Sequence, residues 1–180
     1  MTRWTDARQI FEFIGGAIAH AGSPDELQVA PDAYFKTLVE GGKFRDAVFF
    51  ISHALPRYEG VVWAAQTLLA AEAVDRNNQL VIAVLRWIDD PCEDLRRAVE
   101  KLLTGEVVTS PAYMLAKAAF MSGGSISLAE YPPVLAPPDA SAKFAAGAVF
   151  DAAFISGNPA SLLRQATEIG DAMASQASQR

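Results

Sequence analysis

Residues 110–154 read SPAYMLAKAAFMSGGSISLAEYPPVLAPPDASAKFAAGAVFDAAF, and this stretch decides the fold. Two apolar, Ala-rich patterns with helical spacing lie at its ends, and a long segment that cannot be helical separates them. That segment opens with Ser122-Gly123-Gly124-Ser125 and closes with the pairs Pro132-Pro133 and Pro137-Pro138. The rest of the chain has the pattern of an ordinary helical protein, so we expect specificity to reside in this rigid, non-helical segment.

The remainder of the chain predicts helices with short connections. A chain of 180 residues fits one domain, which we place at residues 1–180. Ala has the highest helix propensity and lets helices approach closely, so the fold class is all-α. We predict a single compact domain of about eight or nine helices in antiparallel pairs, with one long Pro- and Gly-rich loop at about residues 123–139. The predicted helices cover residues 5–20, 31–40, 43–55, 57–74, 77–89, 91–104, 111–122, 140–156 and 159–176, with a short turn at 24–29.

Residues 80–88 are the ambiguous element, because Val81, Ile82 and Val84 would also suit a strand. We prefer helix there, since the chain has no second strand-like run to pair with it.

Four helix starts are marked by a capping side chain followed directly by Pro: Ser23-Pro24, Asp90-Pro91, Ser110-Pro111 and Asn158-Pro159. Pro at the first helical position gives up only an amide that has no partner in the helix, while Ser, Asp or Asn accepts a hydrogen bond from the first turn. In the first two starts a Glu three residues later predicts a capping box.

The third and fourth predicted helices carry the expected core. Within residues 44–55 the apolar residues recur at the spacing of one buried helix face, and His53 falls on the outward side of that pattern. Residues 61–69 are apolar on nearly every side, so this helix is expected to be central. The three tryptophans fall within apolar helix patterns and are predicted to be core or half-buried anchors: Trp4, Trp63 and Trp87.

The composition of the chain indicates which kinds of partner and which cellular compartment to expect. The chain has 15 basic and 21 acidic residues, a net charge of −6, which argues against nucleic acid as a partner. The uncharged runs are too short to span a bilayer, so no membrane insertion is expected. The single cysteine, Cys92, cannot form an internal disulfide, and the N-terminal residues do not form a secretory signal. We therefore expect a cytoplasmic protein.

Two motifs carry a resemblance to a known family. Residues 54–64 read ALPRYEGVVWA, and residues 110–125 contain Ser-Pro-Ala followed by Phe-Met-Ser-Gly-Gly-Ser. With the Pro pairs and the Ala-Ala-Gly-Ala-Val run that follow, the chain resembles an uncharacterised bacterial helical family, domain of unknown function 6931. The resemblance covers roughly residues 31–154 and implies an all-helical fold but no activity. Two positions depart from the pattern, Val62 and Met121, where the family often has Trp.

Ser122-Gly123-Gly124-Ser125 has two interpretations. A phosphate-binding loop would follow a strand, open a helix and usually bring a Lys, whereas this turn follows a helix and leads into Pro-rich chain. It therefore reads as a helix C-cap with Gly in the left-handed position. Ser122 or Ser125 as a nucleophile would need a general base, and the only histidines, His20 and His53, lie in no catalytic context.

The charged clusters also have structural interpretations. Asp89, Asp90, Glu93 and Asp94 could bind a hard cation, but capping and the helix dipole account for their spacing better, so no metal and no cofactor are predicted. The basic residues Arg96, Arg97 and Lys101 are expected to pair locally with Glu93 and Glu100.

We predict a non-enzymatic protein-interaction role, as an adaptor or accessory subunit of a bacterial cytoplasmic system. Its partner would be another protein or a second copy of the chain. The alternative is a small-ligand-binding protein or hydrolase with a pocket near the Ser-Gly-Gly-Ser turn. We expect residues 125–139 to form an extended surface loop, pinned by Tyr131, Val134 and Leu135. No catalytic residue is assigned, and the candidate ligand or partner surface comprises Arg57, Glu59, Ser122, Gly123, Gly124, Ser125 and Tyr131.

Overall fold

A computed structural model describes residues 4–15, 26–104, 110–128 and 130–177, with side chains described as far as Ser175. Within these ranges the chain forms nine α-helices and no β-strand, which confirms the all-α prediction. The helices are α1 (Ala7–Phe13), α2 (Pro31–Glu40), α3 (Phe44–Ala54), α4 (Arg57–Ala70), α5 (Gln79–Asp89), α6 (Glu93–Leu103), α7 (Pro111–Phe120), α8 (Ala140–Ile155) and α9 (Pro159–Ala177).

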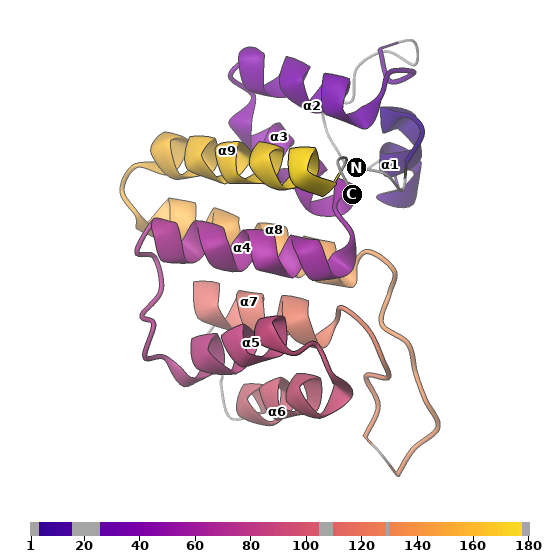
Figure 1. Ribbon diagram of the computed structural model, residues 1–180, viewed down its shortest axis with the longest axis vertical. Coiled ribbons are helices and arrows are strands. Elements are labelled where there is room, and N and C mark those ends of the chain that lie inside the picture. Colours follow the sequence, from indigo (N-terminus) through magenta and orange to yellow (C-terminus); the bar gives the residue numbers. More distant parts are fainter. Residues whose placement is uncertain (1–3, 16–25, 105–109, 129, 178–180) are drawn as a thin grey trace.

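The helices stack in layers along the long axis of the molecule (Figure 1). Helices α1, α2, α3 and α9 form one end, α4 and α8 lie in the middle, and α5, α6 and α7 form the other end. Consecutive helices from α4 to α9 alternate in direction, so neighbours such as α5 and α6, or α7 and α8, are antiparallel pairs. The loop between α7 and α8 projects from the α5–α7 end, away from the termini.

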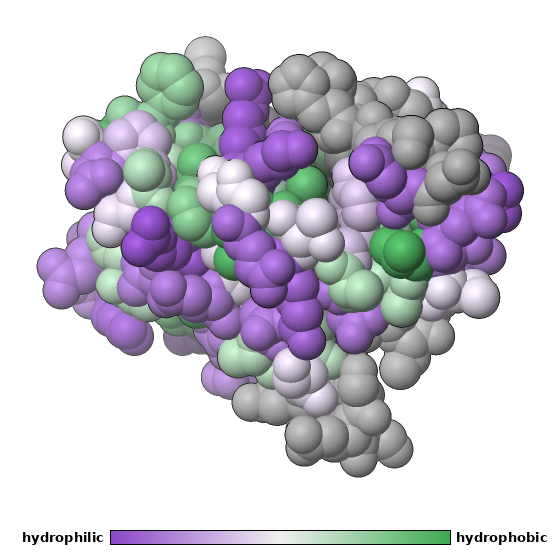
Figure 2. Space-filling view, turned by 90° about the horizontal axis from the view of Figure 1, so that it is seen from above, coloured by the Kyte–Doolittle hydropathy of each residue, from purple (hydrophilic) through white to green (hydrophobic). Residues whose placement is uncertain are grey.

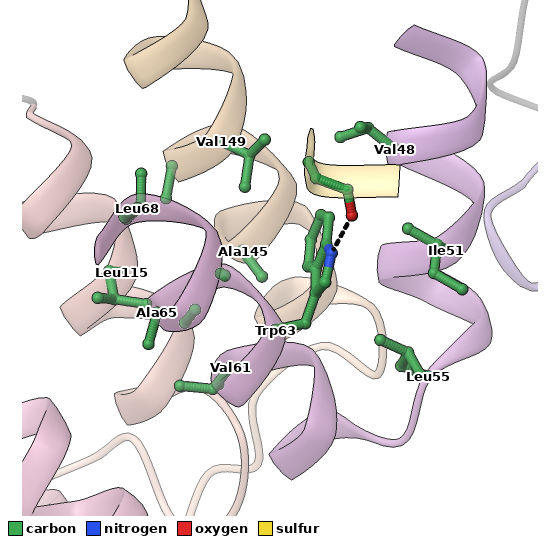
Figure 3. Close-up of a cluster of buried hydrophobic side chains, with 14 of the residues drawn as sticks. Val48, Ile51, Leu55, Val61, Trp63, Ala65, Leu68, Leu115, Ala145 and Val149 are labelled. Carbon is green, nitrogen blue, oxygen red and sulfur yellow. Dashed lines mark hydrogen bonds between the residues drawn. The ribbon is translucent and has the colours of Figure 1, made fainter. Parts of the chain in front are cut away.

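Trp63 of α4 is the centre of the core, as predicted (Figure 3). Its side chain is 0% exposed, and Nε1 donates a hydrogen bond to the Ala166 carbonyl of α9 at 2.9 Å. Burial of a large aromatic with its one polar atom satisfied is strongly stabilising. A Cβ at Gly170 would lie 3.0 Å from Ile51 and 3.3 Å from Trp63 Nε1, so glycine lets α9 pack directly on this cluster.

The Ser110 and Asn158 caps are confirmed. Ser110 Oγ accepts the amide of Tyr113 at 3.1 Å, and Asn158 Oδ1 accepts the amide of Ser161 at 3.3 Å. The cap predicted at Ser23 lies outside the described residues.

The cap predicted at Asp90 is wrong. Asp90 ends α5, and α6 begins at Glu93, with Cys92 in extended conformation before it. Asp90 serves instead as the C-cap of α5, and Glu93 pairs with Arg96 and Arg97 of its own helix instead of closing a capping box.

Two other expectations on helix extent need correction. Helix α4 ends at Ala70 instead of near residue 74, because Glu72 has a φ of +52° and the Ala73 amide returns to Leu68 O. The first helix ends at Phe13, and residues 16–20 of the predicted span lie outside the described chain. Residues 80–88 are helical, as preferred, and Asn78 caps them by accepting the amides of Leu80 and Val81.

The surface at the α2–α9 end is mainly hydrophilic, and hydrophobic residues appear there between hydrophilic ones (Figure 2). Among the described helices, none has the length and apolar character needed to cross a membrane.

Candidate functional site

The Ser-Gly-Gly-Ser turn directly follows the end of α7, as predicted, but the C-cap residue is Met121 in right-handed conformation, and the left-handed glycine comes three residues after it. The amide and Oγ of Ser122 both donate to the Ala119 carbonyl, at 3.2 and 2.7 Å. Gly124 has a φ of +62°, so it supplies the left-handed residue. A Cβ at Gly124 would lie 2.7 Å from Arg96 Nη2 and 2.8 Å from Glu93 Oε2. Gly124 is therefore required both for its backbone conformation and for the close approach of α6.

Arg96 of α6 holds this turn in place. Its side chain is 4% exposed, and it donates to the Phe120 carbonyl at 2.7 Å and to the Ser125 carbonyl at 2.8 Å. Glu93, three residues earlier on the same helix, accepts from Nε and Nη2 at 2.7 Å each. The Arg96 guanidinium also stacks 4.9 Å from the centroid of the Phe120 ring. Hydrogen bonds from Arg96 hold the pKa of the Glu93 carboxyl below its ordinary value.

Two further arginines hold carbonyls of the same segment. Arg97 donates to Ser127 O at 2.9 Å while pairing with Glu100 at 2.6 Å, and Arg57 of α4 makes a long contact to Ser122 O at 3.4 Å. The local pairing predicted for Arg96 and Arg97 is thus confirmed, whereas Lys101, for which pairing was also expected, makes no ion pair within the described residues. We call these three side chains the arginine clamp: Arg57, Arg96 and Arg97.

A serine network closes the loop beyond the clamp. Ser125 Oγ accepts the amides of Ser127 and Val134, each at 3.1 Å. Ser127 Oγ donates to Pro132 O at 2.8 Å, so its 2.8 Å contact with Ser125 Oγ is donated by Ser125. The Ile126 amide donates to Val134 O at 2.8 Å. The two arms of the loop are therefore joined as a narrow antiparallel ribbon.

The ribbon displays apolar side chains to solvent. We call this group the loop patch, and its members are between 52% and 76% exposed: Leu128, Tyr131, Val134 and Leu135. The expectation that Tyr131, Val134 and Leu135 pin the loop is wrong. Polar bonds from the clamp and the serines hold the loop instead, and the apolar contacts come from Ala136, which is buried, and Ile126, which packs on the core.

A pocket of about 330 Å³ lies beside the turn, where the alternative prediction placed one. Its aromatic wall is a Tyr58–Trp87 pair with ring centroids 5.6 Å apart, and Tyr58 Oη donates to Ile88 O at 2.8 Å. The other lining residues are Pro91, Cys92, Glu93, Arg96, Ser122, Gly123 and Gly124. The charged lining groups, Glu93 and Arg96, are already bonded to each other.

His53 does not face outward, contrary to the sequence-based expectation. It is 1% exposed, and Nδ1 lies 2.8 Å from Phe49 O and 3.0 Å from Ser52 Oγ. Since a carbonyl only accepts, Nδ1 carries the proton, and Nε2 is buried with no hydrogen-bond partner among the described residues. Burial lowers the pKa of His53 below its ordinary value of 6.5. The periodicity failed here because α8 and α9 cover a second face of α3.

Among the described residues, neither candidate nucleophile is hydrogen-bonded to a histidine. Ser122 Oγ bonds to Ala119 O, and the Ser125 hydroxyl is used by the serine network. His53 is engaged with Phe49 and Ser52 on α3, and His20 lies outside the described residues. In the part of the chain that is described, no group of three His, Cys, Asp or Glu side chains is arranged to hold a metal ion.

The structure unites part of the predicted surface. Arg57, the Ser122–Ser125 turn and Tyr131 belong to one continuous loop assembly, while half-buried Glu59 makes no ion pair within the described chain. Sequence reasoning missed Arg96 and the apolar neighbours of Tyr131 as site residues. The sequence contained a signal for Val134 and Leu135, because these large apolar residues stand between two Pro pairs and cannot be buried on the face of a helix.

Comparison with known proteins identifies the family. No curated protein matches the chain, and no solved structure matches it. The profile of a family of unknown function, DUF6931, matches residues 34–174, which include most of the core, the arginine clamp and the loop. The chain therefore belongs to this family of unknown function, DUF6931.

Proposed function

We propose that this protein is a non-enzymatic interaction module, an adaptor or accessory subunit of a bacterial cytoplasmic system, and that it docks a partner protein through the loop patch. The observation that carries the proposal is the combination of a firmly bonded loop base with an apolar, exposed tip. Exposure of apolar side chains to water is unfavourable, and a contiguous exposed apolar patch marks a surface that a partner covers.

Preorganisation supports the same role. The clamp and the serine network hold the two arms of the loop, at Phe120 to Ser127 and at Pro132 to Val134, so a partner would not have to order these arms on binding. Less conformational entropy is then lost, and more of the apolar contact energy appears as affinity. Tyr131 is the member of the patch best suited to a central anchor, because Tyr combines a large apolar surface with a hydroxyl.

Site-specific photo-crosslinking tests the proposal. A photoreactive amino acid at Tyr131 should capture one defined protein in cell extract, and the double substitution Leu128→Ser/Leu135→Ser should abolish that capture. Phe154→Ser is the matched control, because Phe154 is 87% exposed at the far end of α8 and lies outside the loop patch. Equal capture by the loop variant and the control would show that the loop patch is not part of the binding surface.

The pocket beside the turn supports one second candidate, a small-ligand site walled by Tyr58 and Trp87. Gly123 offers a direct test, since it lines the pocket and a Cβ there would meet nothing within 4 Å. A small molecule that raises the melting temperature of the wild type but not of Gly123→Leu would favour this candidate. The same stabilisation in both proteins would exclude the pocket as its site.

A further inference from the structure

A second apolar surface lies between α5 and α6. The two helices enclose a groove of about 400 Å³, within the range of roughly 300–1,000 Å³ typical of ligand-binding clefts. One stripe of each helix lines it at i, i+3, i+4 or i+7 spacing. The apolar lining residues are Ile82, Ala83, Leu95, Ala98 and Leu102.

The rim of this groove is basic although the chain as a whole is acidic. Arg86 and Lys101 line the groove, and both side chains are exposed. Neither makes an ion pair within the described part of the chain, whereas the neighbouring Arg96 and Arg97 are fully committed to the loop and to Glu93. An occupant with apolar side chains and a carboxylate would therefore match the groove.

The loop patch has this chemistry. Glu130 lies between Leu128 and Tyr131, and all three are exposed. Glu130 likewise makes no ion pair within the described residues. A protruding segment with two large apolar side chains and one carboxylate is complementary to an apolar groove with two cations on its rim.

The loop projects from the end of the molecule formed by α5, α6 and α7 (Figure 1), and the residues that line the groove belong to α5 and α6 of the same end. This placement matters because a twofold interface uses the same patch on both copies, so each copy must offer both halves of the contact on one side. A loop and a groove at opposite ends would instead build an open chain of molecules.

We infer that a second copy of this chain occupies the groove: the loop patch of each protomer docks between α5 and α6 of the other, with Glu130 facing Arg86 and Lys101. The inference rests on the proposed function in taking the loop patch as the docking element, and it names the partner as the chain itself. The net charge of −6 on each copy opposes the association, so the dimer is weak and forms at high protein concentration.

Sedimentation of the full chain over a concentration series tests the inference with charge-reversed variants. The wild type should show a monomer–dimer equilibrium below about 1 mM, the weak end of specific association. Glu130→Arg, and separately the double variant Arg86→Glu/Lys101→Glu, should each weaken the dimer by at least about tenfold, because like charges then face each other at both contacts.

Mixing these two variants gives the decisive result. In the mixed pair the Arg introduced at position 130 faces the acidic groove, and the wild-type Glu130 of the other copy faces the wild-type groove. Both contacts are then restored, so the mixture should dimerise at concentrations at which each variant alone is mainly monomeric. This recovery also shows that both variants are folded.

Three outcomes would overturn the inference: a wild type that stays monomeric throughout, a dimer unaffected by either variant, or a mixture that does not recover. The proposed function is tested by a separate outcome. If the chain is monomeric yet Leu128→Ser/Leu135→Ser abolishes capture of a different protein at Tyr131, the interaction role stands and only the choice of a second copy is wrong.

Discussion

Nη2 of Arg96 donates to the backbone carbonyl of Ser125 across 2.8 Å, which ties helix α6 to the start of a loop 29 residues further along the chain. The guanidinium is almost completely buried, and its other bonds go to Phe120 O and Glu93. One side chain therefore supplies a hydrogen bond to the Phe120 carbonyl, which has no partner within α7. It also fixes the start of the loop, and its own charge stays paired with Glu93.

Removing this side chain should loosen the loop more than the helices. Arg96→Ala is expected to lower the free energy of unfolding by about 2–4 kcal/mol, since it deletes charge-assisted bonds to two carbonyls. Amide exchange at Ser127 and Val134 should become faster, because the ribbon loses its base. Arg97→Ala is the control: its side chain is more exposed, and a loss of about 1 kcal/mol or less is expected. Equal losses in urea unfolding would contradict the central role of Arg96.

Gly124 should not tolerate a side chain. Gly124→Ala places a Cβ 2.7 Å from Arg96 Nη2 at a φ of +62°, so we expect a loss of about 1–3 kcal/mol. Gly123→Ala is the matched substitution one residue earlier, where the new Cβ would meet nothing within 4 Å. Its effect should be small, and a comparable loss at both positions would show that the contact with Arg96 is not the cause.

Trp63 should be the most costly single truncation in the core. Trp63→Ala is expected to cost about 3–5 kcal/mol, the usual range for a fully buried large aromatic. Trp63→Phe keeps most of the packing and removes the bond to Ala166 O, so it should fall well short of that loss. Denaturant unfolding measures both, and a loss below about 1 kcal/mol for the alanine variant would mean that the packing around Trp63 is not as described.

Stability should fall as the pH drops below 6.5, the ordinary pKa of histidine. Burial lowers the pKa of folded His53, while its bond to Phe49 O and the charge of Asp139 oppose that shift in part and the charge of Lys143 adds to it. Between 6.5 and the folded pKa the unfolded chain binds a proton that the folded chain does not, so acidification favours unfolding.

His53→Gln isolates this contribution, since glutamine is polar but does not titrate. Over the range from about pH 8 to about pH 5, its unfolding free energy should decline less than that of the wild type. Identical pH profiles for the two proteins would assign the decline to other groups.

Part of the candidate site could be predicted from the sequence. The Ser-Gly-Gly-Ser turn and the Pro pairs located the loop, because Gly permits turn conformations and Pro fixes φ and excludes helix, both through local geometry. The direction of Tyr131, Val134 and Leu135 could not be predicted in this way. Whether an apolar side chain in a loop is buried depends on how the ribbon is oriented on the helices, and long-range bonds from Arg96 and Arg97 set that orientation.

His53 and Asp90 show, within the helices, the same limit of prediction from local sequence. The spacing within α3 correctly identified one buried face, but helix packing buried a second, which no single-helix pattern contains. Asp90 had the local signature of a cap, yet Glu93 formed stronger charged bonds with Arg96 and Arg97 and the helix began later.

By itself the sequence determined the fold class, most helix boundaries and the position of the loop. Those features follow from interactions between residues a few positions apart, such as capping by Ser110 and the helical spacing of the apolar residues. Only the tertiary structure decided that the loop patch faces solvent, that Arg96 is buried beneath the turn and that a basic-rimmed groove lies at the same end. Each of these depends on contacts between residues far apart in the chain, whose geometry exists only once the helices have packed.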